Sequence, residues 1–206
     1  MLEELKHLVI KIQREYNRIS ELWLSECEDK EYNLNKSLIK QIESSSLLDS
    51  VFDYTSFLND NIFDFNLSLN NWKENNSEVS TRVKARNSIL FKIGNYQLPI
   101  HQNGEIPVKK CLNDLFGIRI IFDGDYSHEV ISKYIKKEFK ELKCICSDKQ
   151  EYIATHIYFK KKGASKIFQW ELQVWLKNNE INNKVSHNKY KQSYVKWEKE
   201  IKEGSN

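Results

Sequence analysis

Asp114-Leu-Phe-Gly-Ile-Arg119-Ile-Ile-Phe122 combines a carboxylate, a short turn and a run of large apolar residues that contains one arginine. Apart from Arg119, residues 118–122 are β-branched or aromatic, a composition typical of a strand packed inside a sheet. A helix-like segment ends just upstream, so Asp114 is expected at the mouth of this strand and Arg119 on one of its faces. Because burial of an unpaired carboxylate or guanidinium is costly, both need a partner, a metal ion or a phosphate. A salt bridge that ties a helix to the strand is the simpler alternative.

Length and composition predict one substantial core. The chain has 206 residues, of which 40% are hydrophobic and 12% aromatic. The low content of glycine (6 residues) and proline (2 residues) favours long helices with few strands over a turn-rich all-β fold. No apolar run is long enough to span a bilayer, and the charged N-terminus does not resemble a signal peptide. A cytoplasmic protein with no membrane partner is therefore expected.

Charge is distributed unevenly along the chain. Residues 1–75 contain 8 of the 32 Lys and Arg residues but 14 of the 29 Asp and Glu residues. Residues 76–206 are therefore basic, which favours a polyanionic partner such as a nucleotide or RNA, with a solvated lysine-rich surface as the alternative. The four cysteines form no C-x-x-C pair, so we expect all four to pack as small buried side chains and not to bind zinc.

Apolar periodicity divides the chain into two segments. Residues 1–75 are expected to form an N-terminal helical extension, with long helices over 2–25 and 48–72 and a weaker helical pattern over 34–42. Residues 76–206 follow a joint at Asn75-Asn76-Ser77 and mix both element types. Strands are expected at 81–85, 118–122, 142–146, 152–159 and 168–175, and helices at 88–93, 108–115, 127–139 and 184–202. The predicted fold class is therefore α/β (α+β), a mixed sheet of about five strands flanked by helices.

Asp114 and Glu171 are the two carboxylates that this arrangement places on strands. Charged residues are seldom buried without a partner, and Glu171 lies between a tryptophan and a leucine. If they converge with basic side chains, they would hold Mg²⁺ beside phosphates, because Mg²⁺ typically takes one or two carboxylates plus phosphate oxygens. The basic candidates are Arg82, Lys84, Lys92 and Arg119, which would offset the charge that develops during phosphoryl-type transfer. The sequence contains no glycine-rich phosphate loop of the Walker type.

The order of several short motifs resembles the RelA/SpoT synthetase domain. These motifs are Arg82-Val-Lys84 with Ser88 and Lys92, then Asp114 to Ile121, Tyr152-Ile-Ala-Thr-His156, Glu171-Leu-Gln173 and His187-Asn-Lys-Tyr190. The resemblance covers about residues 80–195. It implies a nucleotidyltransferase-like fold, and it implies transfer of the β,γ-pyrophosphate of ATP to a ribose 3′-hydroxyl with Mg²⁺ as cofactor.

The resemblance also implies a role for each matching residue. Asp114 and Glu171 would be catalytic and bind the metal ion, and Glu171 would activate the 3′-hydroxyl. The ATP-binding residues would be Arg82, Lys84, Ser88, Lys92 and Arg119. The acceptor-binding residues would be Tyr152, which would stack on a base, together with His156 and Gln173. His187 and Trp175 are interpreted as packing residues.

The sequence departs from the family's pattern on the acceptor side. The usual Glu-x-Gln-x-Arg-Thr becomes Glu171-Leu-Gln-Val-Trp175-Leu, and Glu151 stands directly before the tyrosine. These departures favour a resemblance to toxic small alarmone synthetases that modify the 3′ end of tRNA, stop translation and are neutralised by an antitoxin. GDP or GTP as acceptor, with synthesis of a stringent-response alarmone, is one alternative. A non-catalytic RNA- or partner-binding module is another, and the acidic helices of residues 1–75 would suit an antitoxin or a second subunit.

Overall fold

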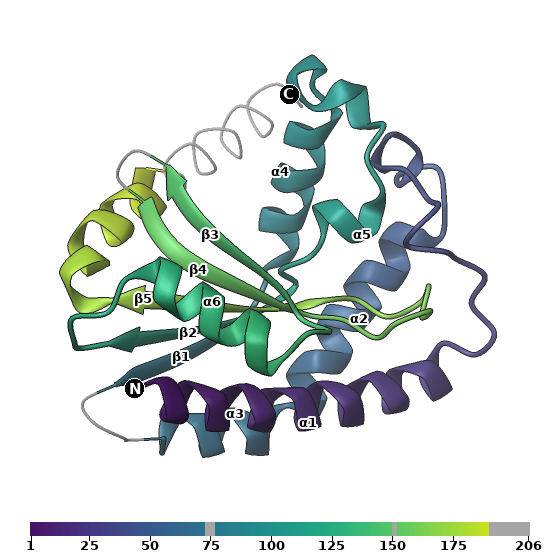
Figure 1. Ribbon diagram of the computed structural model, residues 1–206. Helices are drawn as coiled ribbons and strands as arrows, with labels where there is room; N and C mark the ends of the chain where they lie inside the picture. The colour runs from purple at the N-terminus through teal and green to yellow at the C-terminus, as the bar shows by residue number, and fades with distance from the viewer. Residues whose placement is uncertain (73–76, 150–151, 190–206) are drawn as a thin grey trace.

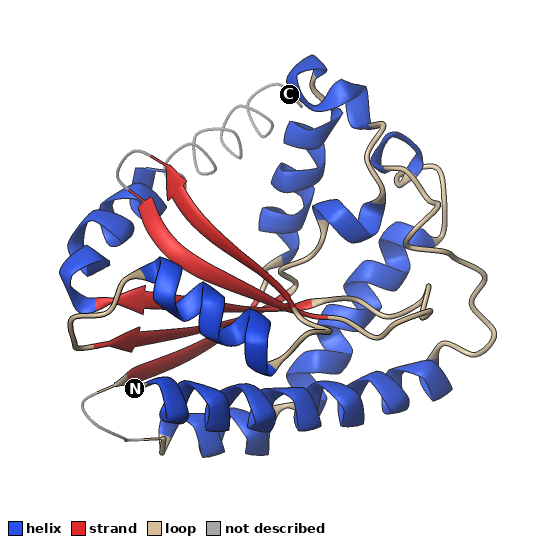
Figure 2. Cartoon of the chain, viewed as in Figure 1, coloured by secondary structure: helices blue, strands red, loops and turns tan. Residues whose placement is uncertain are grey.

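The chain folds around one mixed sheet, described by a computed structural model for residues 1–72, 77–149 and 152–189. The helices are α1 (Leu2–Glu26), α2 (Leu47–Asn61), α3 (Phe63–Asn70), α4 (Arg86–Gln97), α5 (Val108–Cys111) and α6 (His128–Glu138), with short 3₁₀ segments η1 (Ile39–Gln41), η2 (Pro99–Gly104) and η3 (Lys177–Asn179). The strands are β1 (Glu78–Val83), β2 (Phe116–Phe122), β3 (Lys143–Lys149), β4 (Tyr152–Phe159) and β5 (Trp170–Leu176). Figures 1 and 2 show the helices grouped around the strands, which confirms the predicted fold class.

The strand order is β1-β2-β5-β4-β3, so the last strand of the sequence lies in the middle of the sheet. β2 and β5 are parallel, whereas the other neighbouring pairs are antiparallel. The register places Gly117 beside Glu171 and Arg119 beside Gln173. It also places His156 of β4 on the other side of Gln173. Because side chains alternate between faces, these residues share one face of the sheet.

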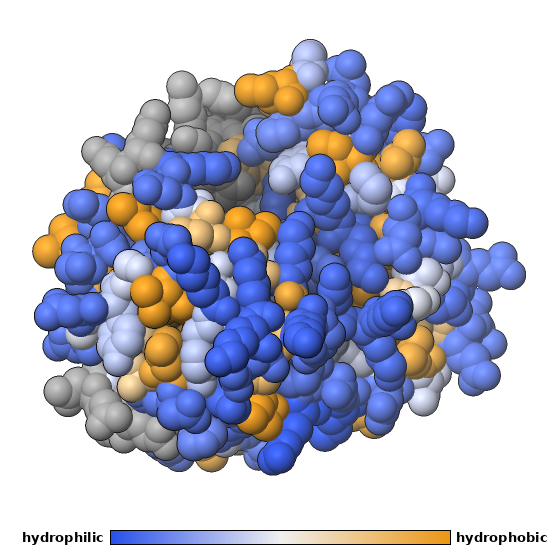
Figure 3. All heavy atoms as spheres, in the orientation of Figure 1, coloured by the Kyte–Doolittle hydropathy of each residue, from blue (hydrophilic) through white to orange (hydrophobic). Residues whose placement is uncertain are grey.

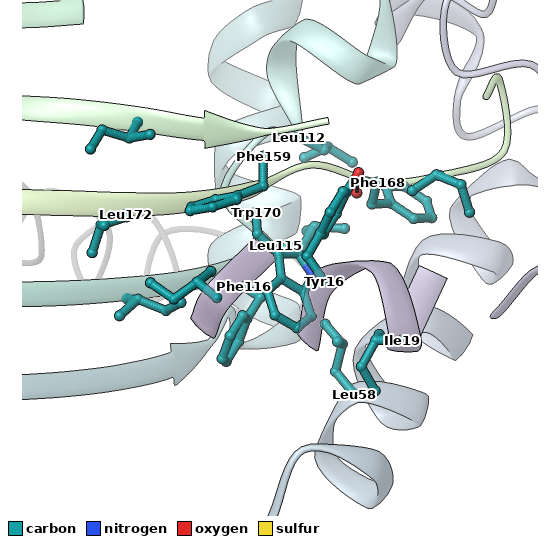
Figure 4. Packing of buried hydrophobic residues seen from close by; sticks show 14 of the residues in the cluster. Tyr16, Ile19, Leu58, Leu112, Leu115, Phe116, Phe159, Phe168, Trp170 and Leu172 are labelled. Carbon is teal, nitrogen blue, oxygen red and sulfur yellow. Dashed lines mark hydrogen bonds between the residues drawn. The ribbon is translucent and has the colours of Figure 1, made fainter. Parts of the chain in front are cut away.

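The opposite face of the sheet is covered by helices. Helix α1 contributes an apolar stripe with the period of a helix, and its buried members include Leu8, Ile12, Tyr16 and Ile19. Figure 4 shows Tyr16 beside aromatic residues from the strands, and its ring meets that of Trp170 edge-on at 5.5 Å. Trp170 also donates a 2.8 Å hydrogen bond to Tyr54 of α2. The helices of residues 1–70 and the sheet therefore share one hydrophobic core.

Three predicted helices differ from the structure. The helix expected over 48–72 is divided at Ile62, where φ −110° and ψ 9° leave the helical region, into α2 and α3. Apolar spacing continues across this break because residues on both sides are buried, so periodicity alone cannot locate it. The segment 34–42 contains only η1, and α5 stops at Cys111 because Leu112 adopts φ −95° and ψ 56°. Residues 180–189 are helical, and the rest of the helix predicted to residue 202 lies outside the described residues.

The surface of the described chain is mainly polar. Figure 3 shows hydrophilic side chains over most of the visible face, with apolar residues in small separate groups. The most exposed large apolar side chains, Ile100, Ile181 and Phe63, lie on three different segments. Within the described ranges, no helix is both long and apolar enough to cross a membrane.

Gly104, at the end of η2, packs closely against the backbone of Lys40, and a substitution at this position tests that packing. Its φ is +76°, and a Cβ atom added there would lie 2.8 Å from the backbone nitrogen of Lys40. We expect Gly104→Ala to lower the free energy of unfolding by about 1–3 kcal/mol, measured by urea denaturation. Gly94→Ala in α4 is the matched control, because nothing lies within 4 Å of an added Cβ. The control should raise stability by about 0.5–1 kcal/mol, and equal effects of the two substitutions would contradict this packing.

Candidate active site

A cavity of about 770 Å³ lies over the polar face of the sheet, and we call it the sheet cavity. Its lining comes from β1, α4, the residues before β2, strands β3 to β5, and helical residues near 187. The predicted site residues on this lining are Arg82, Lys84, Ser88, Lys92, Asp114, Tyr152, His156, Glu171 and Gln173. Arg119 lines a neighbouring hollow of about 290 Å³, the side cavity, which shares Arg82, Gln173 and His187 with the sheet cavity. The fold therefore brings the predicted residues together around two adjoining spaces.

Asp114 is held by cations from two other elements. Lys84 Nζ donates to its Oδ2 at 2.7 Å, and Lys92 Nζ donates to its Oδ1 at 2.9 Å. Arg82 Nη2 is 3.8 Å from the same Oδ2. Burial raises the pKa of Asp114, but the charges of Lys92 and Lys84 outweigh burial and hold the pKa well below its usual range. Asp114 is therefore a carboxylate at neutral pH.

The backbone brings Asp114 and Lys84 to the same place. Lys84 follows β1 directly, and its N–H donates a 2.8 Å hydrogen bond to the carbonyl oxygen of Leu115 at the entrance to β2. Lys92 comes from the middle of α4 and reaches Asp114 from that helix. The simpler alternative from the sequence, a salt bridge between Asp114 and Arg119, is wrong, because Asp114 pairs with the lysines and Arg119 bonds to Gln173.

Glu171 is the second carboxylate of the sheet cavity, and it is only 5% exposed. Its Oε1 is 2.9 Å from His156 Nδ1, and its Oε2 accepts a 2.7 Å hydrogen bond from Gln173 Nε2. Burial raises the pKa of Glu171, but the hydrogen bond from His156 and its charge outweigh burial, so the net pKa is lower than usual. The negative charge of Asp114 acts in the opposite direction, which places the two carboxylates within electrostatic range of each other.

The donor set fits Mg²⁺ that is bound together with phosphate. Within residues 1–72, 77–149 and 152–189, no group of three or more His, Cys, Asp or Glu side chains could hold a metal ion. Two carboxylates facing a cavity with lysines on its wall match the usual way of binding Mg²⁺, in which phosphate oxygens and water complete the coordination. Each oxygen of Asp114 accepts from one lysine, and a carboxylate oxygen retains a further lone pair for a metal ion.

Arg119 is fixed on three sides. Its Nε and Nη2 both donate to Gln173 Oε1, at 3.3 and 3.1 Å, and Nη2 is also 3.2 Å from His187 Nε2. The guanidinium carbon lies 3.7 Å from the centre of the Trp175 ring. The side chain of Arg82 lies over Gly117, because a Cβ atom added to Gly117 would be 3.6 Å from Arg82 Cγ and Nε. Both arginines border the side cavity.

Tyr152 and His156 form the wall of the sheet cavity on β4. The hydroxyl of Tyr152 is 3.2 Å from His156 Nε2, and His156 contacts Glu171 through its other ring nitrogen. Burial raises the pKa of Tyr152 to about 12, so its hydroxyl is neutral at physiological pH. The ring of Tyr158 stacks on that of His156 at 6.4 Å and 14°. This wall offers flat aromatic surfaces beside a carboxylate.

Sequence analysis missed several residues of the site. Tyr158 and Trp175 could have been found from alternation, because each stands two positions after a predicted residue on the same strand. His187 was interpreted as a packing residue, but it lines both cavities and contacts Arg119. No local pattern reveals this, since a helix beyond β5 must fold back to bring it there. Cys146 was expected to be buried, but it is exposed on the edge strand β3.

No model of a known protein family matches the chain, and no curated protein matches it. The chain is similar to small alarmone synthetases. The solved structure of small alarmone synthetase 1 from Bacillus subtilis aligns with a TM-score of 0.40 and 17% identity, over 74% of this chain and 82% of that one. Small alarmone synthetase 2 from the same organism aligns with a TM-score of 0.42 and 17% identity, over 72% of this chain and 82% of that one. A GTP pyrophosphokinase family protein from Streptococcus pneumoniae aligns with a TM-score of 0.42 and 15% identity, over 73% of this chain and 78% of that one.

Proposed function

We propose that the chain is an ATP-dependent pyrophosphokinase of the RelA/SpoT synthetase type. The observation that supports this most strongly is the pair of buried carboxylates, Asp114 and Glu171, in one cavity with Lys84 and Lys92. Carboxylates for Mg²⁺ and fixed cations for phosphate oxygens are the groups that phosphoryl-type transfer requires. The proposed reaction moves the β,γ-pyrophosphate of ATP to a ribose 3′-hydroxyl of an acceptor.

The reacting groups can be assigned to the two sides of the sheet cavity. The 3′-oxygen forms a bond to the β-phosphorus, the bond from that phosphorus to the bridging α,β-oxygen breaks, and AMP leaves. Glu171 takes the proton of the 3′-hydroxyl and returns it to solvent. Bound Mg²⁺ would hold the triphosphate and offset its charge. Lys84, Lys92 and Ser88 contact phosphate oxygens, and Asp114 keeps the two lysines in place.

The nucleotides occupy the spaces on either side of these groups. In the side cavity, Arg82 and Arg119 face the adenine of ATP. On β4, Tyr152 supplies a ring for the acceptor base, with His156 and Gln173 as polar neighbours. The side cavity joins the sheet cavity at Arg82 and Gln173, so one ATP molecule can extend from the first space into the second.

As acceptor we favour the 3′ end of tRNA, with GDP or GTP as the alternative. The acceptor side of the sheet cavity is bordered by the edge strand β3, which exposes Lys143 and Lys149. α6, which packs against the opposite face of β3 and β4, also exposes Lys133, Lys136 and Lys137. Basic residues that extend beyond the cavity suit a polyanion larger than one nucleotide. Such an enzyme would act in the cytoplasm as a translation-blocking toxin, and the acidic N-terminal helices are the surface that we propose for a neutralising antitoxin.

Incubation with γ-labelled ATP and Mg²⁺ tests the acceptor directly. We expect label on tRNA in preference to GDP or GTP, and the labelling should weaken with increasing salt because phosphate contacts are screened. Periodate-oxidised tRNA is the matched control, since it lacks the 3′-hydroxyl but retains the rest of the polyanion. Label that appears only in guanosine tetra- or pentaphosphate would show that the acceptor is GDP or GTP.

A further inference from the structure

Trp175 differs from the other buried tryptophan of β5 in what it packs against. Trp170 lies in the main core among α1, α2 and the strands. Trp175 is also fully buried, but on the opposite face, in a small separate cluster with Ile121, Ala154 and the edge of Tyr152. Its ring lies under the guanidinium of Arg119. Trp175 is therefore buried by residues beside the cavities and not by the main core.

Arg119 borders the side cavity while three other residues hold its guanidinium. Trp175 covers one face at 3.7 Å, and Gln173 and His187 contact the nitrogens at 3.1 to 3.3 Å. Arg119 lines the side cavity together with Arg82 and Gly117. A planar guanidinium that is already stacked and oriented loses little side-chain entropy when a flat ligand stacks on its other face.

We propose that Trp175 is a positioning residue, which holds Arg119 flat so that it forms a platform for the nucleobase of the donor in the side cavity. This inference rests on the proposed function, because it assumes that the donor is a nucleotide. Trp175 therefore affects binding of the base only through its contact with Arg119. The triphosphate is contacted by other residues, so the effect should be confined to the base.

The test compares binding of ATP with binding of inorganic tripolyphosphate, which carries the phosphates without the base. Calorimetry on the full chain should show that Trp175→Leu weakens ATP binding about tenfold, which corresponds to about 1.4 kcal/mol and lies within the range of a partly desolvated arginine–aromatic stack. Tripolyphosphate binding should remain unchanged. Trp175→Phe keeps a flat ring and should restore ATP binding to within about threefold of the parent chain. Trp175→Met, a flexible side chain without a flat face, should behave like Trp175→Leu and replaces it if the leucine variant does not fold.

Two further variants separate positioning from a structural role. Arg119→Ala should lose ATP affinity, and adding Trp175→Leu to it should cause no further loss, because the two residues act through one contact. Trp170→Phe, in the main core, should lower thermal stability but leave the ratio of ATP to tripolyphosphate affinity unchanged. If Trp175→Leu or Trp175→Met weakens both ligands equally, or weakens neither, the inference is wrong. If the parent chain binds tripolyphosphate but shows no preference for ATP, the proposed function itself is wrong.

Discussion

Glu171→Gln is expected to lower the rate of pyrophosphate transfer by about 10²- to 10⁴-fold, the usual contribution of a general base. Glutamine has nearly the same shape, so it can remain between His156 and Gln173, but it cannot accept the proton of the 3′-hydroxyl. The measurement is single-turnover transfer from γ-labelled ATP, with ATP binding determined in parallel. We expect ATP binding to change far less than the rate, because Asp114, Lys84 and Lys92 remain on the side of the Mg²⁺ and the phosphates.

Glu138→Gln is the control for this experiment. Glu138 lies on α6 and pairs at 2.6 Å with Lys6 on α1, so its removal costs one partly exposed ion pair. Transfer by this variant should stay within about twofold of the parent chain. If Glu171→Gln is as active as Glu138→Gln, the general-base assignment fails. Absence of transfer in the parent chain as well, with RNA binding retained, would support a non-catalytic module.

Asp114→Asn is expected to have the second large effect, on stability as well as activity. The substitution leaves Lys84 and Lys92 without the carboxylate that both contact, and loss of one partner of a buried ion pair costs about 3–5 kcal/mol. Urea denaturation measures this loss. Asp53→Asn removes an exposed carboxylate that pairs with Lys30, and it should cost about 1 kcal/mol or less. If the two substitutions lower the free energy of unfolding equally, then Lys84 and Lys92 do not need the charge of Asp114 to remain buried.

The stability of the two proteins should rise with pH over different pH ranges. The lowered pKa of Asp114 contributes stability to the parent chain above about pH 4, and this contribution is lost as the pH falls further. In Asp114→Asn, burial lowers the pKa of Lys84 without the opposing charge. The folded variant then binds fewer protons than its unfolded chain, so its stability should rise between about pH 7 and 10. A variant whose stability is constant over this range would contradict the burial of a charged Lys84.

The sequence predicts the strands better than the contacts between them. Residues 152–159 were predicted as a strand and form β4, and alternation correctly places Glu171, Gln173 and Trp175 on one face. Three aspects depended on long-range packing that local patterns do not record. These are the parallel pairing of β2 with β5, the convergence of two lysines on Asp114, and the return of His187 to Arg119.

The position of β5 has a consequence for synthesis of the protein. β5 joins β2 to β4, yet it follows both in the sequence, so a growing chain first holds two unconnected strand pairs, β1-β2 and β3-β4. Each pair has an open edge until residues 170–176 leave the ribosome, and open edges favour association with other chains. The same strand delivers Glu171. A nascent chain therefore acquires the central strand of its sheet and its proposed general base in one step, and remains inactive until that step.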